Sequence, residues 1–365
     1  MTTLAGPPSP LPATPPSLAF VGCFTTAKRL ARGQGIDVYR IAPPPAPWVL
    51  IDHVGDLVNP SFLITDPARK ILYAVHGDAD YASAFAIEPS TGRLRPLGQA
   101  PTGGLNGVHQ ALDPSSRFLV VANYASGSLA LLPVRPDGGL EAFSHLLPLP
   151  GATGPHRTEQ TLSHPHHVVF DPSGRFLLVP DKGLDRIFVL AVDADRGGLR
   201  IVSQALMRPG AGPRHIVFHP SRPIAFVVNE LDSSVATCGF DAAAGVLTPR
   251  HVAPCLPPGF FGASTAAAIV ITPCGRFVHA SNRGQDGITH FAFDAAEERL
   301  RVIGWTPAQG REPRFMILTP HGEQLLVANE QGDTIVPFAI DAASGGIAAS
   351  GAALPSASPC TIAFL

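Results

Sequence analysis

Three histidines lie within four residues just before an apolar run. They are His164, His166 and His167, in the segment S-H-P-H-H-V-V-F at residues 163–170. Imidazole titrates near neutral pH and also ligates metals, so this segment can act as a general base or bind a metal. Strand alternation sends His164 and His166 to one side and His167 to the other. A metal site normally needs a third ligand, and no paired spacing supplies one, so we expect neither a metal nor another cofactor.

A repeat of about 48 residues decides where this segment lies. Each copy reads as four short strands, with Pro and Gly at the turns and Val, Ile, Leu and Phe in the runs between them. No stretch shows a helical period. Four antiparallel strands repeated at this spacing are typical of a β-propeller blade. The turn prolines of successive copies are 47, 58, 48, 53 and 47 residues apart: Pro67, Pro114, Pro172, Pro220, Pro273 and Pro320.

The two ends of the chain distinguish a closed ring from an open solenoid of β-repeats. The C-terminal segment S-P-C-T-I-A-F-L reads as a first strand, and L-A-F-V-G-C, G-I-D-V-Y-R-I and W-V-L-I-D-H-V read as strands two to four. A blade shared between the termini closes the ring and leaves no open sheet edge. We therefore predict an all-β fold, a seven-bladed β-propeller with four antiparallel strands per blade, over residues 17–365. Residues 1–16 are expected to form a disordered Pro-rich tail.

Charged residues that differ from blade to blade point to one mouth of the central channel. In a propeller the first strand of each blade lines the channel, and the second runs antiparallel beside it. The start of strand one and the end of strand two therefore share a face. An anion site needs varied charged groups there, because arginine offers a bidentate fork to carboxylate or phosphate. The residues at these positions include His166, Arg214, Arg314, Lys182, Glu230, Arg283 and Tyr124.

Structural interpretations of the same residues stay open. Arg214–Glu230 and Arg314–Glu330 can be ion pairs between blades. Asn229 and Asn282 end second strands, where an asparagine side chain can close the turn by bonding nearby backbone. The long spacing before Pro172 adds residues 151–161 on the same face, and we expect this loop to cover the mouth with His156 or Arg157 reaching in.

Composition excludes several classes of partner. The chain has 26 basic and 28 acidic side chains, so a nucleic-acid footprint is not expected. No apolar run reaches 18 residues, which argues against a membrane span. The five cysteines are scattered, without C-x-x-C, and the N-terminus lacks the pattern of a signal peptide. We therefore predict a cytoplasmic protein whose partner is a small anionic metabolite, and leave the oligomeric state open.

Two blocks in particular resemble a known family. H-P-H-H-V-V-F-D-P-S-G-R-F-L-L-V-P-D-K-G and G-P-R-H-I-V-F-H-P-S-R-P-I-A-F-V-V-N-E are similar to the lactonase family of seven-bladed propellers. That family includes propeller-type 6-phosphogluconolactonases and 3-carboxy-cis,cis-muconate lactonising enzymes. The resemblance implies a catalytic set of His166, Arg214, Glu230 and Arg283. The chain departs from the family at V-H-G-D, residues 75–78, where the family tends to have Asn-Glu.

The resulting hypothesis is hydrolysis of a small carboxylated or phosphorylated lactone. His166 would be the base, Glu230 would orient it or act instead, and Arg214 and Arg283 would hold the anionic group and the oxyanion. No G-x-S-x-G elbow is present, so an acyl-enzyme is not expected. The alternatives are a carboxymuconate cyclase and a non-catalytic propeller that presents its faces to a protein or ligand. Further substrate contacts are predicted at Arg314, Lys182, Arg157, Tyr124, Asn229 and Asn282.

Overall fold

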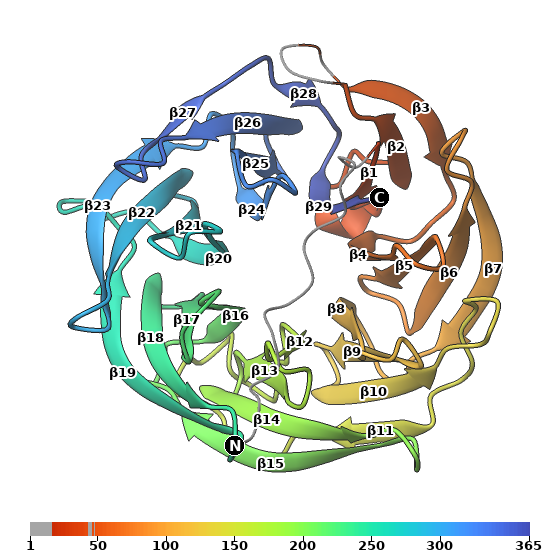
Figure 1. Ribbon diagram of the computed structural model, residues 1–365, viewed down its shortest axis with the longest axis horizontal. Helices are drawn as coiled ribbons and strands as arrows, with labels where there is room; N and C mark the ends of the chain where they lie inside the picture. The colour runs from red at the N-terminus through yellow and green to blue at the C-terminus, as the bar shows by residue number, and fades with distance from the viewer. Residues whose placement is uncertain (1–16, 43–45, 47) are drawn as a thin grey trace, which may run out of the picture.

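Seven antiparallel sheets surround a central channel in the computed structural model (Figure 1). The structure describes residues 17–42, 46 and 48–365, so the predicted tail at residues 1–16 lies outside the described residues. In each sheet the strands are hydrogen-bonded in the order in which the repeat predicts them, from the channel outward. The described part of the chain contains a single helical turn, the 3-10 helix η1 (Ala27–Arg29). The predicted all-β seven-bladed propeller is confirmed.

Six blades are built from consecutive strands. Their bounds are β4 (Pro60–Asp66), β5 (Ile71–His76), β6 (Tyr81–Ile87), β7 (Leu94–Pro101); β8 (Gly107–Leu112), β9 (Phe118–Asn123), β10 (Ser128–Pro133), β11 (His145–Pro148); β12 (Val169–Phe170), β13 (Leu177–Asp181), β14 (Arg186–Asp193), β15 (Gly198–Leu206); β16 (Pro213–Phe218), β17 (Ile224–Asn229), β18 (Ser234–Asp241), β19 (Val246–Pro254); β20 (Thr265–Ile271), β21 (Phe277–Arg283), β22 (Gly287–Asp294), β23 (Arg299–Pro307); and β24 (Pro313–Leu318), β25 (Gln324–Asn329), β26 (Thr334–Ile340), with β27 (Ile347–Ala349) and β28 (Leu354–Pro355).

The seventh blade joins the two ends of the chain. Its strand order is β29 (Pro359–Phe364), β1 (Leu18–Cys23), β2 (Ile36–Arg40) and β3 (Val49–Val54). The amide of Leu365 donates to the carbonyl of Leu18 at 3.0 Å, which continues the antiparallel β1–β29 pairing. The C-terminal strand is therefore the innermost strand of a blade begun by N-terminal strands, as the closure argument requires.

Short-range turn chemistry fixes the strand pairs. In the D-P-S-G-R turn, the Asp171 carboxylate accepts hydrogen bonds from the amides of Ser173 and Phe176 at 3.0 and 2.7 Å. Gly174 adopts φ 72°, a left-handed conformation that glycine reaches without steric cost. The second strands are buried on both faces because each is sandwiched between neighbouring blades, so they are continuous apolar runs such as I-A-F-V-V-N in β17.

Two strands differ from the ideal repeat. The histidines were expected to alternate as part of the first strand, but β12 contains only Val169–Phe170. Pro180 lies opposite the segment and has no N–H to donate, so the regular ladder of hydrogen bonds is interrupted. Isolated hydrogen bonds remain, such as the one that the His166 amide donates to the Pro180 carbonyl at 3.0 Å. In the blade of β24, the outer strand is split into β27 and β28, and both pieces pair with β26.

Candidate active site

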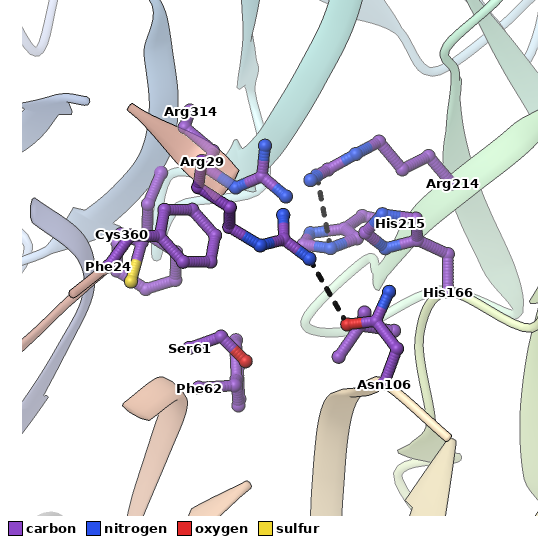
Figure 2. A pocket seen from close by; sticks show the side chains of 12 residues that line it. Phe24, Arg29, Ser61, Phe62, Asn106, His166, Arg214, His215, Arg314 and Cys360 are labelled. Atoms are coloured by element: carbon purple, nitrogen blue, oxygen red, sulfur yellow. Dashed lines mark hydrogen bonds between the residues drawn. The ribbon is translucent and has the colours of Figure 1, made fainter. Parts of the chain in front are cut away.

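One mouth of the channel holds a small cavity of about 20 Å³, enough space for one bound water. Figure 2 shows side chains that come from different blades and turn toward this cavity. His166 precedes β12, Arg214 lies on β16 and Arg314 on β24, which confirms that they share one face of the disc. The lining residues are Phe24, Arg29, Ser61, Phe62, Asn106, Val108, His166, Arg214, His215, Arg314, Phe315 and Cys360.

Glu230 is the anion at the centre of a cluster of buried cations. Its carboxylate lies 2.9 Å from Arg214 Nε, 3.0 Å from Lys182 Nζ and 3.3 Å from Arg283 Nη2. Burial opposes ionisation, but Arg283, Lys182 and Arg214 hold the pKa of Glu230 well below its usual range. Glu230 is therefore a permanent carboxylate near neutral pH. It is better suited to position cations than to accept a proton.

The cations of this cluster outnumber the carboxylates. Lys182 has a second partner, Glu159, at 2.7 Å, so two carboxylates face Lys182, Arg214 and Arg283. Burial favours the neutral amine, yet Glu230 next to Lys182 raises the pKa of that amine above its usual value. The cluster keeps an excess of positive charge in a site shielded from solvent, where an anionic ligand is attracted strongly.

Arg214 is held in place from three directions. Besides Glu230, its Nη1 donates to the carbonyl of Ala267 at 2.6 Å and lies 3.2 Å from His215 Nε2. Burial and the nearby Arg283 lower the pKa of Arg214 to about 9, so it remains a cation at neutral pH. The guanidinium is thus fixed beside the cavity before any substrate arrives, which is the preorganisation that oxyanion stabilisation needs.

His166 is a buried, neutral imidazole. The residue is 6% exposed, and its Nδ1 has no hydrogen-bond partner among the residues the structure describes. Its ring meets that of Tyr124 edge-on, with centroids 5.4 Å apart. Burial and then Arg214 lower the pKa of His166 well below 6.5, so the ring carries a free lone pair at neutral pH.

Three more histidines fill the channel behind His166. His167 stacks on His215 with ring centroids 4.6 Å apart and meets His109 at 4.0 Å. Burial lowers the pKa of all three, in His167 to about 3. No group of three or more His, Cys, Asp and Glu side chains within the described ranges is arranged to hold a metal ion.

These depressed pKa values predict loss of stability in acid. Below pH 6.5 the unfolded chain binds protons that the buried rings do not, so the free energy of unfolding falls until pH reaches the folded-state pKa. For His167, with a pKa of about 3, the loss between pH 7.5 and 5 is about 2 kcal/mol. When urea unfolding is measured at pH 7.5 and at pH 5, the free energy of unfolding should fall by less in His167→Gln than in wild type, and the difference should equal this loss. Equal falls in variant and wild type would contradict the prediction.

The loop at residues 151–161 closes on the site through residues other than the predicted ones. His156 and Arg157 are exposed, so the expectation that one of them reaches into the mouth is wrong for this conformation. Glu159 binds Lys182 instead, and Gln160 Nε2 donates to the Lys182 carbonyl at 2.8 Å. A substrate contact of Arg157 stays a prediction that requires the loop to move.

The two asparagines lie inside their blades. Asn229 Nδ2 donates to Ser234 Oγ at 2.9 Å, and Asn282 Nδ2 donates to Thr289 Oγ1 at 2.9 Å. Both side chains are buried and neither lines the cavity. The geometry therefore gives them a structural contact between second and third strands, and their predicted substrate contact stays a prediction.

Both proposed ion pairs exist, but neither joins two blades. Arg214 and Glu230 belong to the blade of β16–β19, and Arg314 and Glu330 to that of β24–β28, where Arg314 Nη1 lies 3.3 Å from Glu330 Oε2. The connections between blades are made by Lys182 and Arg283, which reach Glu230 from either side. Glu230 is thus both a structural partner and part of the cation cluster.

Sequence reasoning missed Arg29, which lines the cavity from η1 in the connection between β1 and β2. Its partner is Asp78, the last residue of the V-H-G-D departure, at 2.7 Å. That departure was the one signal in the sequence that this part of the mouth differs.

No helix among the described residues is long and apolar enough to cross a membrane.

The fold and the cation cluster define a seven-bladed propeller whose channel mouth holds more buried cations than carboxylates. The chain belongs to the family described as lactonase, 7-bladed beta-propeller, whose model matches residues 18–364. It is 30% identical over 267 residues to a Bacillus subtilis 6-phosphogluconolactonase, covering 72% of this chain and 75% of that one. A Formosa agariphila 6-phosphogluconolactonase is 31% identical over 327 residues, 84% and 88% of the two chains. The solved structure of Pseudomonas aeruginosa periplasmic gluconolactonase is 29% identical, with a TM-score of 0.86 over 96% and 99% of the chains.

Proposed function

We propose that the protein hydrolyses a small anionic lactone, with 6-phosphogluconolactone as the substrate. The observation that carries the proposal is a neutral, buried imidazole beside cations that exceed their carboxylate partners, at His166, Arg214 and Arg283. Relatives at 30% and 31% identity named 6-phosphogluconolactonase support the choice of substrate. The cavity has room for one water, which suits a reaction in which water is the nucleophile.

His166 is proposed as the general base. As water oxygen bonds to the lactone carbonyl carbon, the water proton passes to the imidazole, and the carbonyl oxygen becomes an oxyanion. The tetrahedral centre then collapses, the bond between that carbon and the ring oxygen breaks, and the imidazolium returns its proton to the leaving oxygen. The product is the open hydroxy acid, and the imidazole is neutral again.

The fixed cations are proposed to stabilise the negative charge. Arg214 is held by Glu230, the Ala267 carbonyl and His215, so it meets the developing oxyanion without reorganisation. Lys182 and Arg283 add to the positive potential around it. Tyr124 contacts His166 edge-on and stacks on His164 with ring centroids 4.4 Å apart, so it supports the histidine segment from outside the cavity lining, and its substrate contact stays a prediction.

Turnover by the purified protein tests this proposal. We expect hydrolysis of 6-phosphogluconolactone, followed as proton release, at a rate above the spontaneous opening of the lactone. Carboxymuconates are assayed in parallel, because the cyclase alternative also uses a histidine with arginine clamps and stays a prediction. Absence of turnover on all these substrates, in protein whose circular dichroism is β-rich, would contradict an enzymatic role and favour a binding propeller.

A further inference from the structure

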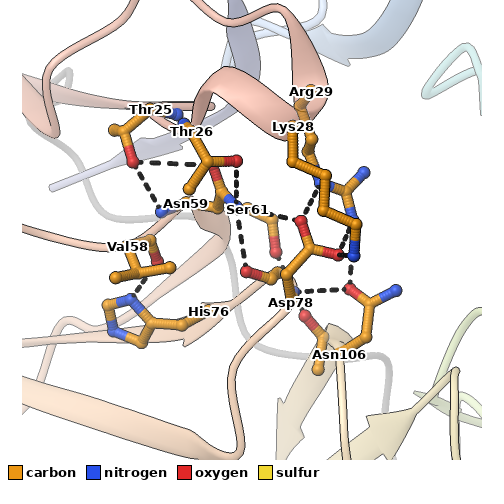
Figure 3. A network of polar contacts seen from close by, with 12 residues as sticks. Thr25, Thr26, Lys28, Arg29, Val58, Asn59, Ser61, His76, Asp78 and Asn106 are labelled. Carbon is orange, nitrogen blue, oxygen red and sulfur yellow. Dashed lines mark hydrogen bonds and ion pairs between the residues drawn. The ribbon is translucent and has the colours of Figure 1, made fainter.

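Arg29 is carried to the channel mouth by a segment outside the seven-blade repeat. It is the last residue of η1, between β1 and β2, and it reaches across to the neighbouring blade (Figure 3). Its Nε and Nη2 donate to the two oxygens of Asp78 at 2.7 and 3.0 Å, and Nη2 also lies 3.3 Å from Asn106 Oδ1. A bidentate pair of this kind fixes the plane of the guanidinium.

Asp78 is itself held firmly. Its carboxylate accepts from Asn59 Nδ2 at 3.2 Å, and its amide donates to Asn106 Oδ1 at 3.0 Å. Asn59 also accepts from the amides of Thr25 and Thr26 at 2.8 and 3.1 Å, which ties the start of the η1 segment to the same network. Asn59, Asp78 and Asn106 all have left-handed φ angles, of 36°, 65° and 58°, a conformation that Asn and Asp tolerate better than most residues. The network therefore positions Arg29 before a ligand binds.

Arg29 and Arg314 form a pair of cations over one aromatic ring. Their guanidinium carbons lie 4.6 and 5.0 Å from the centroid of the Phe24 ring. Figure 2 shows both groups turned toward the cavity that His166 and Arg214 also line. Within the described residues, Arg29 Nη1 makes no hydrogen bond, and Arg314 uses only Nη1, on Glu330. Donors of both arginines thus remain available to an acceptor at the mouth.

The two arginines differ from the deeper cations in solvent access. The side chains of Arg29 and Arg314 are 23% and 20% exposed, whereas those of Lys182 and Arg214 are each 3% exposed. The site therefore has a deep cation cluster around Glu230 and a shallow pair at the rim. A ligand with two polar ends, one uncharged and reactive and one strongly anionic, matches this arrangement.

We propose that Arg29 and Arg314 form a phosphate subsite at the rim, which binds the phosphoryl group of the substrate while the lactone lies at His166. The assignment rests on the proposed lactonase function and adds to it a residue that sets substrate choice. A phosphoryl group carries about −1.5 to −2 charges near pH 7 and offers three acceptor oxygens, so it can bridge two guanidinium groups. Asp78 acts as a positioning residue through Arg29.

The test compares phosphorylated and unphosphorylated forms of one lactone in Arg29→Gln. The ratio of kcat/KM for 6-phosphogluconolactone to kcat/KM for glucono-1,5-lactone should fall about 10- to 100-fold, because a charge-assisted contact to phosphate is lost. Asp78→Asn keeps the size of the side chain but frees Arg29, and should lower the same ratio less. Lys28→Gln is the matched control: Lys28 lies on η1, 3.4 Å from Asp78, but is 79% exposed and does not line the cavity.

A binding measurement separates this inference from the proposed activity. Calorimetric titration with 6-phosphogluconate and with gluconate needs no turnover, so it decides on the subsite even if neither lactone is hydrolysed. Weaker binding of 6-phosphogluconate to Arg29→Gln than to wild type and Lys28→Gln would support the subsite. Equal loss for the phosphorylated and unphosphorylated compounds, equal binding by Arg29→Gln and wild type, or no binding by wild type would overturn it.

Discussion

Replacing His166 by alanine is expected to lower kcat for lactone hydrolysis about 100- to 10,000-fold, the range that a positioned general base contributes. The imidazole is neutral because burial and Arg214 depress its pKa, so it can take the water proton at physiological pH. Arg214 and Arg283 remain in the variant, so KM should change far less than kcat. Steady-state kinetics with 6-phosphogluconolactone would measure both values.

The pH dependence of kcat/KM in the wild type tests the role of His166 in a second way. A base is inactive when protonated, so kcat/KM falls as pH drops through the pKa of His166. Because that pKa lies well below 6.5, activity should stay level from pH 8 to below 6.5 and decline only in stronger acid. With glucono-1,5-lactone, which has no phosphoryl group to titrate in this range, a decline centred at 6.5 would mean that a solvent-exposed histidine acts instead.

His167→Asn supplies the matched control for this prediction. His167 comes from the same segment but packs against His109 and His215, and it does not line the cavity. Its substitution should leave kcat within a few-fold of wild type. Similar losses in His166→Ala and His167→Asn would indicate that the segment matters for packing rather than for proton transfer.

The fold was predictable because its determinants are local and repeated. The D-P-S-G-R turn contains its own cap, in which Asp171 bonds the amides of Ser173 and Phe176. The apolar runs of the second strands mark burial on both faces, and the two chain ends supply complementary parts of one blade. The short β12 was not predicted because the missing bond depends on Pro180, whose place opposite the histidines is a matter of register.

Only those site residues that lie at regular positions of the repeat could be predicted from the sequence. His166 and Arg214 lie at the start of a first strand, and Glu230 and Arg283 lie at the end of a second strand, so the repeat placed all four on one mouth. Glu159 and Arg29 come from connections that do not follow the repeat, and their contacts with Lys182 and Asp78 depend on loop conformation. Arg157 is exposed and Glu159 is half-buried against Lys182, and periodicity cannot distinguish two residues so close in the sequence.

Removing the charge of Glu230 is expected to destabilise the fold by about 3–5 kcal/mol, the cost of breaking a buried ion pair from one side. The carboxylate is within 3.3 Å of Lys182, Arg214 and Arg283. In Glu230→Gln these cations repel one another with only Glu159 left as an anion, so turnover should be lost as well. Urea unfolding at pH 7.5 would measure the change in the free energy of unfolding.

Glu330→Gln is the matched control, because it breaks a single pair nearer solvent, with side chains 20% and 14% exposed. Its cost should be smaller than that of Glu230→Gln, because one cation rather than three loses its carboxylate. The double variant Glu230→Gln, Arg283→Met removes one of the repelling cations and should recover part of the loss, a coupling that a double-mutant cycle measures directly. If Glu230→Gln costs no more than Glu330→Gln, the three cations are neutralised by other means, and Glu230 does not organise the mouth. Recovery in the double variant would identify repulsion among the buried cations as the source of the loss in Glu230→Gln.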